Sequence, residues 1–445
     1  MVLMGWLFNI YFQKYARENQ LPFILLVEYP DGSTYQSRPG TPDFTLRIRR
    51  RWSLLMMMVL GNYGFITQYV KGRMDIEGDL RYLYFLTAMT GKGLAAEERH
   101  EDQMNPLLRL MNKWHMYWYE GRTRKQAIWN AEFHYGEPPE FWFPILGKTG
   151  GYTCGYWTNE TRDVDEAEHN KYEHVCRKIH LDRPGLRIAT VGGGFGYFEL
   201  LAAEKYGAII DSFEVVKSKN DWLRAEARRR GLGDRITVYE GEQRDVGMRK
   251  GMYDRFVSIG VYEHAGPHSQ EAVIRAMAEC LKPGGIGILH WIGKDIPQAT
   301  AVYMHNYLYP GAMLAPLGKA VEHMGHNDLE ILDIENLRRH YHHTLNGWLD
   351  NFLANWEEIK KINPKRYDQF FFRNFYAYLA LCSSYFIVPG SVLRLWQVTF
   401  SKGDTTTYPM TREFIYDSTK AQEPLRGSKW QMITNDIIAQ DPRRM

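Results

Sequence analysis

The chain has 445 residues and a formal net charge of +3, and 44% of its residues are hydrophobic. This composition is typical of a folded protein with two or three domains, and the small charge gives no indication of a nucleic-acid partner. The four cysteines stand apart without a CxxC pair, which argues against a disulfide framework or a zinc site. The first residues lack the features of a signal peptide, and the apolar runs are too short to span a bilayer. We therefore predict a cytoplasmic protein that associates with a membrane surface without crossing it.

The N-terminal part is predicted to form a small mixed domain followed by a linker. Strand-like runs flank Asp31-Gly32, a dipeptide typical of hairpin turns. Residues 61–89 are expected to pass from a loop into a helix, and the polar stretch 91–103 is expected to be a linker. A basic and aromatic helical stretch follows at 107–129.

From residue 168 the sequence alternates strand, turn and helix, which predicts an α/β fold with a parallel, doubly wound sheet. The expected strands are 186–191, 208–216, 235–241, 255–261 and 286–293. Aromatic helices follow, and Trp348, Phe352 and Trp356 recur there at the spacing of one buried helix face. A last strand is expected at 393–403. The chain thus divides into 1–130, 131–403 and a polar, surface-wrapping tail at 404–445.

A glycine-rich turn, VGGGFG at 191–196, lies between an expected strand and an expected helix. Gly192, Gly194 and Gly196 allow a ligand to approach the backbone, because no Cβ intervenes. A dinucleotide site would show G-x-G-x-x-G, but here Gly196 comes one residue early. The spacing favours S-adenosylmethionine, which has no pyrophosphate to bind.

Five further blocks occur in order: GGYTCGYW (150–157), DRFVSIGVYEHAG (254–266), LKPGGIGILHWIG (281–293), HYHHTLNGWLDNFLANWEEI (340–359) and LRLWQVTFSKG (393–403). Together they closely resemble the cyclopropane-fatty-acyl-phospholipid synthase family, which includes the mycolic acid cyclopropane synthases. Residues 61–80 resemble the small N-terminal domain of that family, so the resemblance covers residues 22–403. It implies a Rossmann-like class I methyltransferase sheet with inserted aromatic helices, preceded by a lipid- or membrane-associated domain.

The resemblance also implies a reaction. The family transfers a methyl group from S-adenosylmethionine to a cis double bond of a phospholipid acyl chain, and bound bicarbonate removes a methyl proton as a cyclopropane ring closes. The bicarbonate ligands map onto Cys154, Glu263, His290, the backbone of Ile292, and Tyr341. Aromatic faces stabilise the cation without reacting, which gives the aromatic excess a function. The implied partners are unsaturated phospholipid acyl chains and a membrane surface, and a homodimer is allowed.

The cofactor residues carried over from the family are Tyr152, Thr153, Gly192, Gly194, Gly196, Val216, Lys217, Asp221, Glu242 and Gln243. The glycine-rich turn departs from the family pattern LDIGCGWG, because Thr190 replaces the acid, Gly193 the cysteine and Phe195 the tryptophan. Val216 likewise stands where a hydroxyl residue is usual, and Gln243 replaces an aromatic residue. These departures predict that cofactor binding is weaker than is usual for the family.

The cost of the lost polar contacts is expected to be about 1–3 kcal/mol. Thr190→Asp together with Val216→Thr should then tighten binding, provided that both positions face the ligand. Glu214 offers a carboxylate on the same strand face as Val216, but about 7 Å further back.

Three alternatives remain open. A branching C-methyltransferase would use the same cation but lose a different proton, giving a methyl- or methylene-branched chain. A lipid-binding homologue would have lost the cofactor, which the altered turn favours and the intact set of Cys154, Glu263, His290 and Tyr341 disfavours. A small-molecule N-methyltransferase would share the fold, as some plant alkaloid enzymes do, but the N-terminal domain and LWQVTFSKG argue against it.

Overall fold

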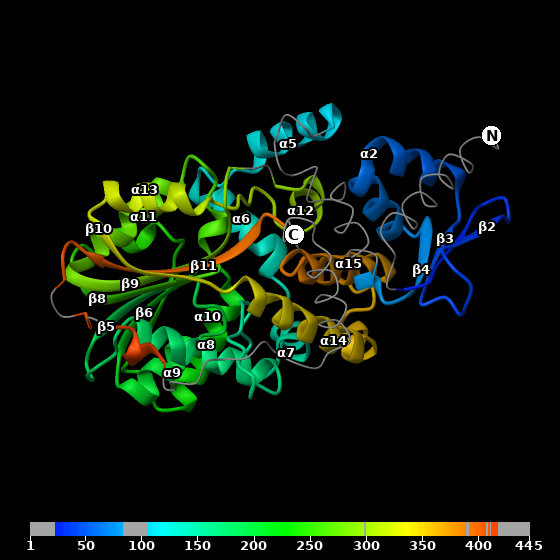
Figure 1. Cartoon of the computed structure of the whole chain (residues 1–445). Helices are drawn as coiled ribbons and strands as arrows, with labels where there is room; N and C mark the ends of the chain where they lie inside the picture. The colour runs from blue at the N-terminus through cyan, green and yellow to red at the C-terminus, as the bar shows by residue number, and fades with distance from the viewer. Residues whose placement is uncertain are drawn as a thin grey trace.

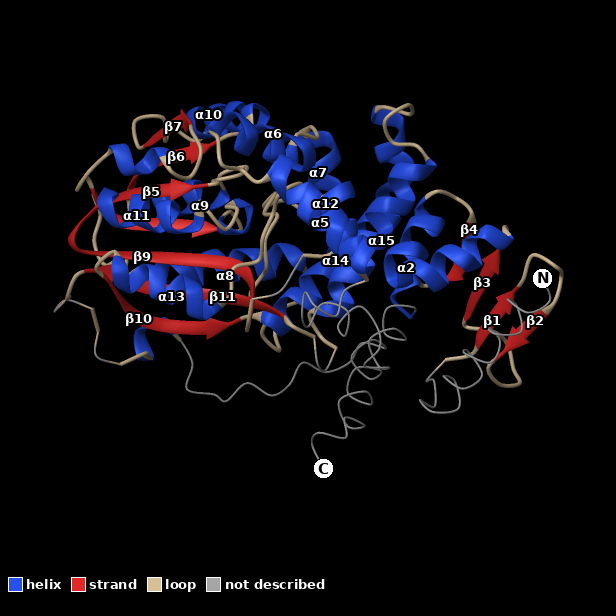
Figure 2. Cartoon of the chain, turned by 90° about the horizontal axis from the view of Figure 1, so that it is seen from above, coloured by secondary structure: helices blue, strands red, loops and turns tan. Residues whose placement is uncertain are grey.

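The computed structural model describes residues 23–82, 105–297, 300–388, 391–405, 408–409 and 411–416. Its main feature is a seven-stranded sheet of order β10-β11-β9-β8-β5-β6-β7 (Figure 1, Figure 2). The strands are β5 (Arg187–Val191), β6 (Ile209–Glu214), β7 (Ile236–Glu240), β8 (Tyr253–Ile259), β9 (Leu281–Lys294), β10 (Leu329–Asn336) and β11 (Leu393–Lys402). Strands β5 to β9 are parallel, whereas β11 is antiparallel to both of its neighbours. The predicted doubly wound sheet is confirmed.

Helices cover both faces of this sheet (Figure 1). One face packs against α8 (Val164–Lys178), α9 (Tyr197–Tyr206) and α10 (Lys217–Arg229), and the other against α11 (Gln270–Cys280) and α13 (Leu317–His326). Each face has its own apolar core. Ile188 and Ile210 are fully buried on the first face, and Leu289 and Val398 on the second. Because both faces exclude water, the central strands are nearly continuous apolar runs.

The strand order reverses between β5 and β8, which are neighbours in the sheet. The chain leaves β5 for α9 on one face and leaves β8 for α11 on the other. The loops after these strands therefore diverge and leave a crevice at the carboxyl edge. The glycine loop, Gly192–Gly196, follows β5, and the short helix η3 (Tyr262–His264) follows β8. The glycine loop and Glu263 thus lie at the same edge of the sheet.

Aromatic helices gather beyond this carboxyl edge (Figure 2). They are α7 (Pro139–Leu146), α12 (Val302–Tyr307), α14 (Arg338–Ile362) and α15 (Gln369–Tyr385), with α5 (Pro106–Tyr119) and α6 (Arg124–Tyr135) beside them. Trp348, Phe352 and Trp356 of α14 are buried in one core, so the helical stripe is confirmed as a packing face. The division expected at residue 130 lies inside α6.

A small sheet of order β2-β1-β3-β4 lies at the opposite end of the molecule (Figure 1). Its strands are β1 (Leu25–Glu28), β2 (Thr34–Gln36), β3 (Phe44–Ile48) and β4 (Met74–Gly78). β1 and β2 form the predicted hairpin, with Gly32 in the turn at a φ of +85°. Arg373 of α15 ties this sheet to the aromatic helices through a 2.6 Å ion pair with Asp75.

The structure corrects three expectations. The strand β4 (Met74–Gly78) lies within residues 61–89, which were expected to pass from a loop into a helix. Residues 61–70, expected to begin as a loop, continue the helix α2 (Arg51–Val70), which bends at Gly61 where φ is +53°. The edge strand β10 was missed because it carries acids in place of an apolar run. Two of these acids, Asp333 and Glu335, bind the buried ammonium of Lys178 at 2.9 and 2.7 Å. The expected linker at 91–103 lies outside the described residues.

The described part of the tail packs on the main domain. The hydroxyl of Tyr408 donates to the backbone oxygen of Lys178 at 3.1 Å, and Arg412 forms a 2.5 Å ion pair with Asp333. Residues 417–445 lie outside the described part of the chain. Within the described ranges, none of the helices combines the length and apolar character needed to cross a membrane.

Candidate active site

The glycine loop requires glycine at alternate positions. Gly192, Gly194 and Gly196 have φ values of +71°, +59° and +78°, which residues with a Cβ rarely adopt. A Cβ at Gly192 would also lie 2.1 Å from the side chain of Val261. At Gly194, by contrast, a Cβ would meet no atom within 4 Å. The loop therefore presents bare backbone to an open space at Gly194.

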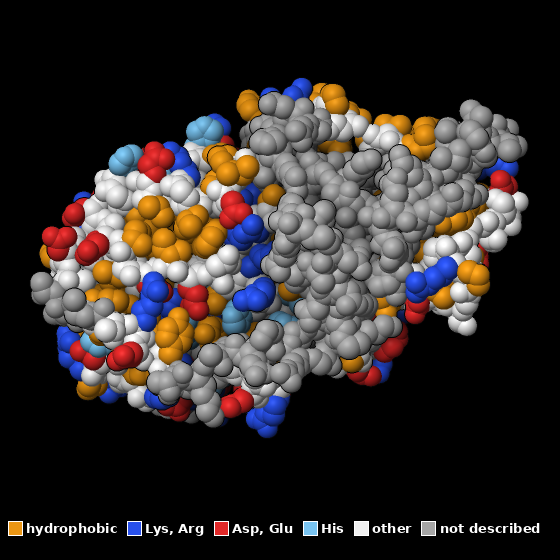
Figure 3. Space-filling model, viewed as in Figure 1, with side chains coloured by type: hydrophobic (Ala, Val, Ile, Leu, Met, Phe, Trp, Pro, Cys, Tyr) orange, Lys and Arg blue, Asp and Glu red, His pale blue; other side chains and the backbone are white. Residues whose placement is uncertain are grey.

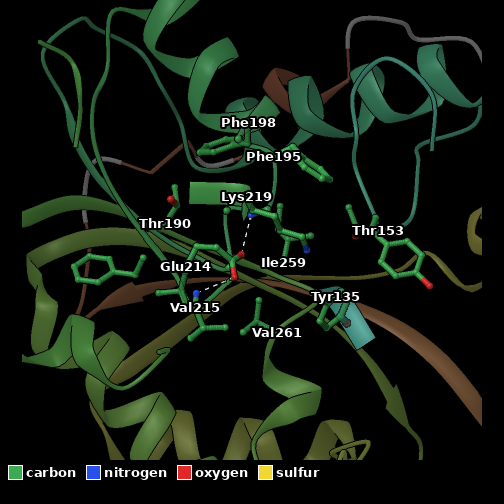
Figure 4. Close-up of a pocket in the computed structure, with 18 of the residues that line it drawn as sticks. Tyr135, Thr153, Thr190, Phe195, Phe198, Glu214, Val215, Lys219, Ile259 and Val261 are labelled. Atoms are coloured by element: carbon green, nitrogen blue, oxygen red, sulfur yellow. Dashed lines mark hydrogen bonds between the residues drawn. The ribbon is translucent and has the colours of Figure 1, made fainter. Parts of the chain in front are cut away.

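That space is the first cavity, which lies between the glycine loop, the end of β6 and the loop after β8 (Figure 4). Of the cofactor residues carried over from the family, Tyr152, Thr153, Gly192, Gly194, Gly196, Glu242 and Gln243 line it. Val216, Lys217 and Asp221 are not in its wall. Val216 is buried at the start of α10, while Lys217 and Asp221 form a 2.5 Å ion pair on the exposed surface of that helix. β6 ends at Glu214, so strand alternation does not extend to Val216.

Glu214 brings a carboxylate to this cavity from the end of β6. Its Oε2 accepts from the N–H of Gly194 at 3.0 Å, and its Oε1 accepts from the N–H groups of Val215 and Val216 at 2.8 and 2.9 Å. These bonds fix the carboxylate between the glycine loop and the start of α10, where the helix dipole favours a negative charge. The sequence feature that could have identified Glu214 as a residue of the cavity is an acid at the carboxyl end of the strand that follows the glycine loop.

A buried lysine, Lys219, lies in the same cavity, close to Glu214 (Figure 4). Its ammonium is 4.5 Å from the centre of the Tyr135 ring. Burial lowers the pKa of Lys219, and the charge of Glu214 opposes this shift. The Tyr135 hydroxyl lies 2.8 Å from Nε2 of His264. Lys219, Tyr135 and His264 could not be singled out from the sequence, because no motif or spacing links α6, α10 and η3.

A second cavity adjoins the first and is lined mainly by apolar and aromatic side chains. The two cavities share Tyr135, Tyr152, Thr153, Gly260 and His264 in their walls. Of the proposed bicarbonate ligands, Glu263, His290, Ile292 and Tyr341 line the second cavity. The fold therefore brings three separate sequence blocks together at one place.

Glu263 and His290 each have one side-chain polar atom that is unpartnered among the described residues. The N–H of Ile292 donates to Oε1 of Glu263 at 2.5 Å, but Oε2 has no partner. Burial lowers the pKa of His290 to about 3, so the imidazole is neutral. Its Nδ1 lies 3.2 Å from the amide nitrogen of Gln397, which donates, so the ring proton resides on the buried, unpartnered Nε2. The cavity thus holds an acceptor on Glu263 and a donor on His290.

Cys154 is not in the wall of either cavity. Its side chain is fully buried, its thiol donates to the backbone oxygen of Gly155 at 3.2 Å, and burial raises its pKa well above the usual value. A thiol in this setting stays neutral and unreactive. The GGYTCGYW block reaches the cavities through Tyr152 and Thr153 instead.

Three tyrosine hydroxyls form a chain where the cavities meet. Tyr152 donates to Tyr378 at 2.9 Å, and the Tyr378 and Tyr309 hydroxyls are 2.7 Å apart. Nε2 of His134 lies 3.1 Å from the Tyr152 hydroxyl. Burial raises the pKa of each tyrosine and lowers the pKa of His134, so this cluster is neutral. It offers aromatic faces that stabilise a cation without reacting with it.

The pKa of Glu263 leads to a prediction about stability. Burial raises this pKa from 4.5 to about 7. The resulting stabilisation is fully present below pH 4.5 and is lost as the pH rises through about 7, because only the protonated form is favoured on folding. Glu263→Gln removes this titration. Between about pH 4 and pH 8, the free energy of unfolding of the wild type should therefore fall by roughly 3 kcal/mol relative to that of the variant. Denaturant unfolding of both proteins would measure this fall, and parallel pH curves would contradict it.

The sheet order, the glycine loop after β5 and the acid at the end of β6 define a class I, S-adenosylmethionine-dependent methyltransferase fold. The family model described as mycolic acid cyclopropane synthetase matches residues 122–398, which is more than half of the chain. The chain therefore belongs to the mycolic acid cyclopropane synthetase family, and the resemblance seen in the sequence is confirmed.

Individual relatives agree with this assignment. A cyclopropane-fatty-acyl-phospholipid synthase of Escherichia coli (strain K12) is 28% identical over 63% of this chain and 70% of its own length. A probable fatty acid methyltransferase of Pseudomonas putida is 26% identical over 76% of this chain and 82% of its own length. The solved structure of a cyclopropane synthase from Mycobacterium tuberculosis superposes with a TM-score of 0.57 at 20% identity, covering 62% of this chain and 98% of that one. That likeness supports the fold.

Proposed function

We propose that this chain transfers a methyl carbon from S-adenosylmethionine to a cis double bond of an unsaturated phospholipid acyl chain and forms a cyclopropane ring. The observation that carries the proposal is the junction of two unlike cavities. The first exposes glycine backbone and carboxylates, and the second is mainly apolar. A polar, cationic cofactor suits the first and an acyl chain suits the second. The names of the Escherichia coli and Pseudomonas putida relatives support a lipid substrate.

Bicarbonate fits the polar end of the second cavity. Its hydroxyl can donate to Oε2 of Glu263, and its oxygens can accept from Nε2 of His290, the two atoms left unpartnered among the described residues. Tyr341 lines the same cavity and adds a hydroxyl. When bound, bicarbonate would supply the base that removes a proton from the transferred methyl group. Cys154 has no part in this proposal, because its thiol is bonded outside the cavity.

The protein's own contribution is to position the reactants and exclude water. An alkene is a weak nucleophile, so its double bond must be held in line with the methyl group. Water must be kept away, since it would capture the cation. The neutral tyrosine cluster at the junction meets the second need, because it is buried and presents aromatic faces that do not react with a cation. His264 adds no positive charge there, since burial lowers its pKa to about 4.

Labelled methyl donor tests this function directly. The protein would be incubated with vesicles of a cis-unsaturated phospholipid and S-adenosylmethionine that carries a CD₃ group. Ring closure removes one deuteron, so the product should gain a CD₂ unit and show the upfield ring-proton signals of a cyclopropane. A product that keeps all three deuterons would identify a methyl-branching enzyme. A CD₂ product with two new sp² carbon signals and no ring-proton signals would identify a methylene-branching one. Absence of any labelled lipid, in a protein that binds phospholipid, would instead support the lipid-binding homologue.

Two stretches of the chain are rich in arginine, residues 47–51 and residues 224–230. In the run at 47–51, Arg47 pairs with Glu28 and Glu77, and Arg49 pairs with Asp75. These arginines are thus neutralised within the small sheet. α5 exposes most of its large apolar side chains. The exposed set is Leu107, Leu110, Trp114, Tyr117, Trp118 and Tyr119.

We propose that α5 docks on the bilayer that contains the substrate. Figure 3 shows hydrophobic side chains along the upper rim, over α5 and α2. α5 packs against α12, and Met304 of α12 lines the second cavity, so the helix lies close to the acyl site. Amphipathic helices with aromatic and basic residues bind the membrane interface in this way.

Vesicle co-sedimentation should show this contact. Trp114→Ala with Trp118→Ala is expected to weaken binding to anionic vesicles by about tenfold or more, because two large apolar side chains leave the interface. Binding by the wild type should also fall with ionic strength, since each basic residue near the surface contributes about 1 kcal/mol and salt screens it. Phe370→Ala, an exposed aromatic residue on α15, is the matched control. Equal binding by the double variant and the control would contradict the role of α5.

A further inference from the structure

A second acidic residue of the first cavity, Glu199, contacts Thr190, the residue at which the chain departs from the family pattern just before the glycine loop. The family pattern has an acid at the position of Thr190, directly before the loop. In this chain the Thr190 hydroxyl donates to Oε1 of Glu199 at 2.6 Å, and the Ser212 hydroxyl donates to the same oxygen at 3.1 Å. Glu199 comes from the first turn of α9 and is 1% exposed. Its carboxylate is therefore bound to the very residue that replaced the acid.

Gly193 is part of the same arrangement. A Cβ at this position would lie 2.3 Å from Oε1 of Glu199 and 2.5 Å from Oγ of Ser212. The cysteine that the family carries there would thus displace the Glu199 carboxylate. The departures at 190 and 193 are therefore explained together, because a threonine anchors the carboxylate and a glycine makes room for it.

Among the glutamates that line the first cavity, Glu199 is the one with a carboxylate oxygen that has no hydrogen-bond partner in the described part of the chain. Glu214 accepts three backbone N–H groups, and Glu242 binds the side chain and the N–H of Arg244. Oε2 of Glu199, by contrast, is buried without a hydrogen-bond partner among the described residues. Burial raises the pKa of Glu199, as expected for a carboxylate that lacks a cation. The buried ammonium nearby, that of Lys171, is paired with Glu168 at 3.1 Å.

We propose that Oε2 of Glu199 binds the α-ammonium of the methionine part of S-adenosylmethionine, in place of the acid that the family carries at position 190. A buried carboxylate oxygen is best satisfied by a charged N–H donor. S-adenosylmethionine has one such donor group, because its sulfonium carries no hydrogen and its ribose and adenine donors are neutral. This inference rests on the proposed function, which supplies the cofactor. It makes the altered loop a relocated site and not a damaged one.

Calorimetric titration with two ligands tests the assignment. S-adenosylhomocysteine carries the ammonium, whereas 5′-methylthioadenosine lacks the whole amino-acid part. Glu199→Gln should lower the affinity for S-adenosylhomocysteine by about tenfold and leave that for 5′-methylthioadenosine within about twofold. Glu204→Gln, an exposed residue of the same helix that pairs with Arg230 at 3.2 Å, is the matched control and should change neither affinity.

The outcomes separate this inference from the proposed function. Equal losses for both ligands would show that Glu199 only supports the loop, and an unchanged affinity for S-adenosylhomocysteine would show that it does not meet the ligand. Either result overturns the inference and leaves the methyltransferase proposal intact. Failure of the wild type to bind S-adenosylhomocysteine at millimolar concentration would overturn the proposed cofactor and this assignment with it.

Placing the ammonium-binding acid at Glu199 leads to a prediction for Thr190→Asp that is the reverse of the tighter binding expected from the sequence. Thr190→Asp alone should weaken binding of S-adenosylhomocysteine, because it places a second carboxylate beside Glu199 and removes its hydroxyl donor. Thr190→Asp combined with Glu199→Gln should bind more tightly than either single variant, since one acid is then present at the family position. Tighter binding by Thr190→Asp alone would contradict the relocation. Thermal unfolding of all three variants would show whether a lost affinity reflects a lost fold.

Discussion

Glu263→Gln is expected to lower lipid turnover by about 100-fold or more while leaving the affinity for S-adenosylhomocysteine within about twofold. Glu263 lines the second cavity and is not in the wall of the first, so its loss should spare cofactor binding. The glutamine keeps the size of the side chain and can still accept from the N–H of Ile292, which binds Oε1. It removes the charge and the second acceptor oxygen, on which the proposed bicarbonate site depends.

Two measurements make this result decisive. Turnover would be followed as labelled lipid product, and binding by calorimetry on the same preparations. Glu357→Gln, an exposed residue of α14 on neither cavity wall, controls for the loss of a carboxylate as such. A Glu263→Gln protein that retained half of the wild-type turnover would remove Glu263 from the chemistry. Loss of cofactor binding as well would place its role in the first cavity or in folding.

The sequence predicted those parts of the fold that depend on repeated local patterns. The parallel strands β5 to β9 and the buried face of α14 follow from apolar runs and helical spacing, which neighbouring residues carry by themselves. β10 was missed because its acids are matched by a cation from another element, Lys178 of α8. The residues after Gly61 were expected to begin as a loop because glycine usually breaks a helical pattern, whereas here α2 bends at Gly61 and continues.

The candidate site shows the same difference between residues that a sequence pattern identifies and residues whose importance depends on a contact with a distant element. The resemblance supplied Glu263, His290, Ile292 and Tyr341, which the structure gathers on one cavity wall. It also supplied Val216, but this residue lies outside the wall of the first cavity, because β6 ends at Glu214 and Val216 is buried at the start of α10. Glu199 could not be found in this way. Its significance lies in a contact with Thr190 across the glycine loop, and no motif marks a helix residue that takes over the role of a strand residue.

Blocking the second cavity should separate lipid chemistry from cofactor binding. Ala312 is 5% exposed and lines the second cavity but not the first. Ala312→Trp would fill space that the acyl chain needs, so we expect lipid turnover to fall by about 100-fold, as the loss of a well-positioned substrate implies. Affinity for S-adenosylhomocysteine should stay within about twofold, because no change in the first cavity is involved.

Ala131→Trp provides the reciprocal variant, since Ala131 of α6 lines the first cavity and not the second. It should reduce the affinity for S-adenosylhomocysteine and leave binding of a fluorescent acyl chain unchanged. Ala312→Trp should weaken binding of the acyl chain and leave the affinity for S-adenosylhomocysteine unchanged. Thermal unfolding would confirm that both variants fold, since overpacking a buried site costs about 1–3 kcal/mol. If Ala312→Trp bound the acyl chain and turned it over like the wild type, the second cavity would not be the lipid site. The pair of variants therefore tests the division of labour between the cavities, on which the proposed reaction depends.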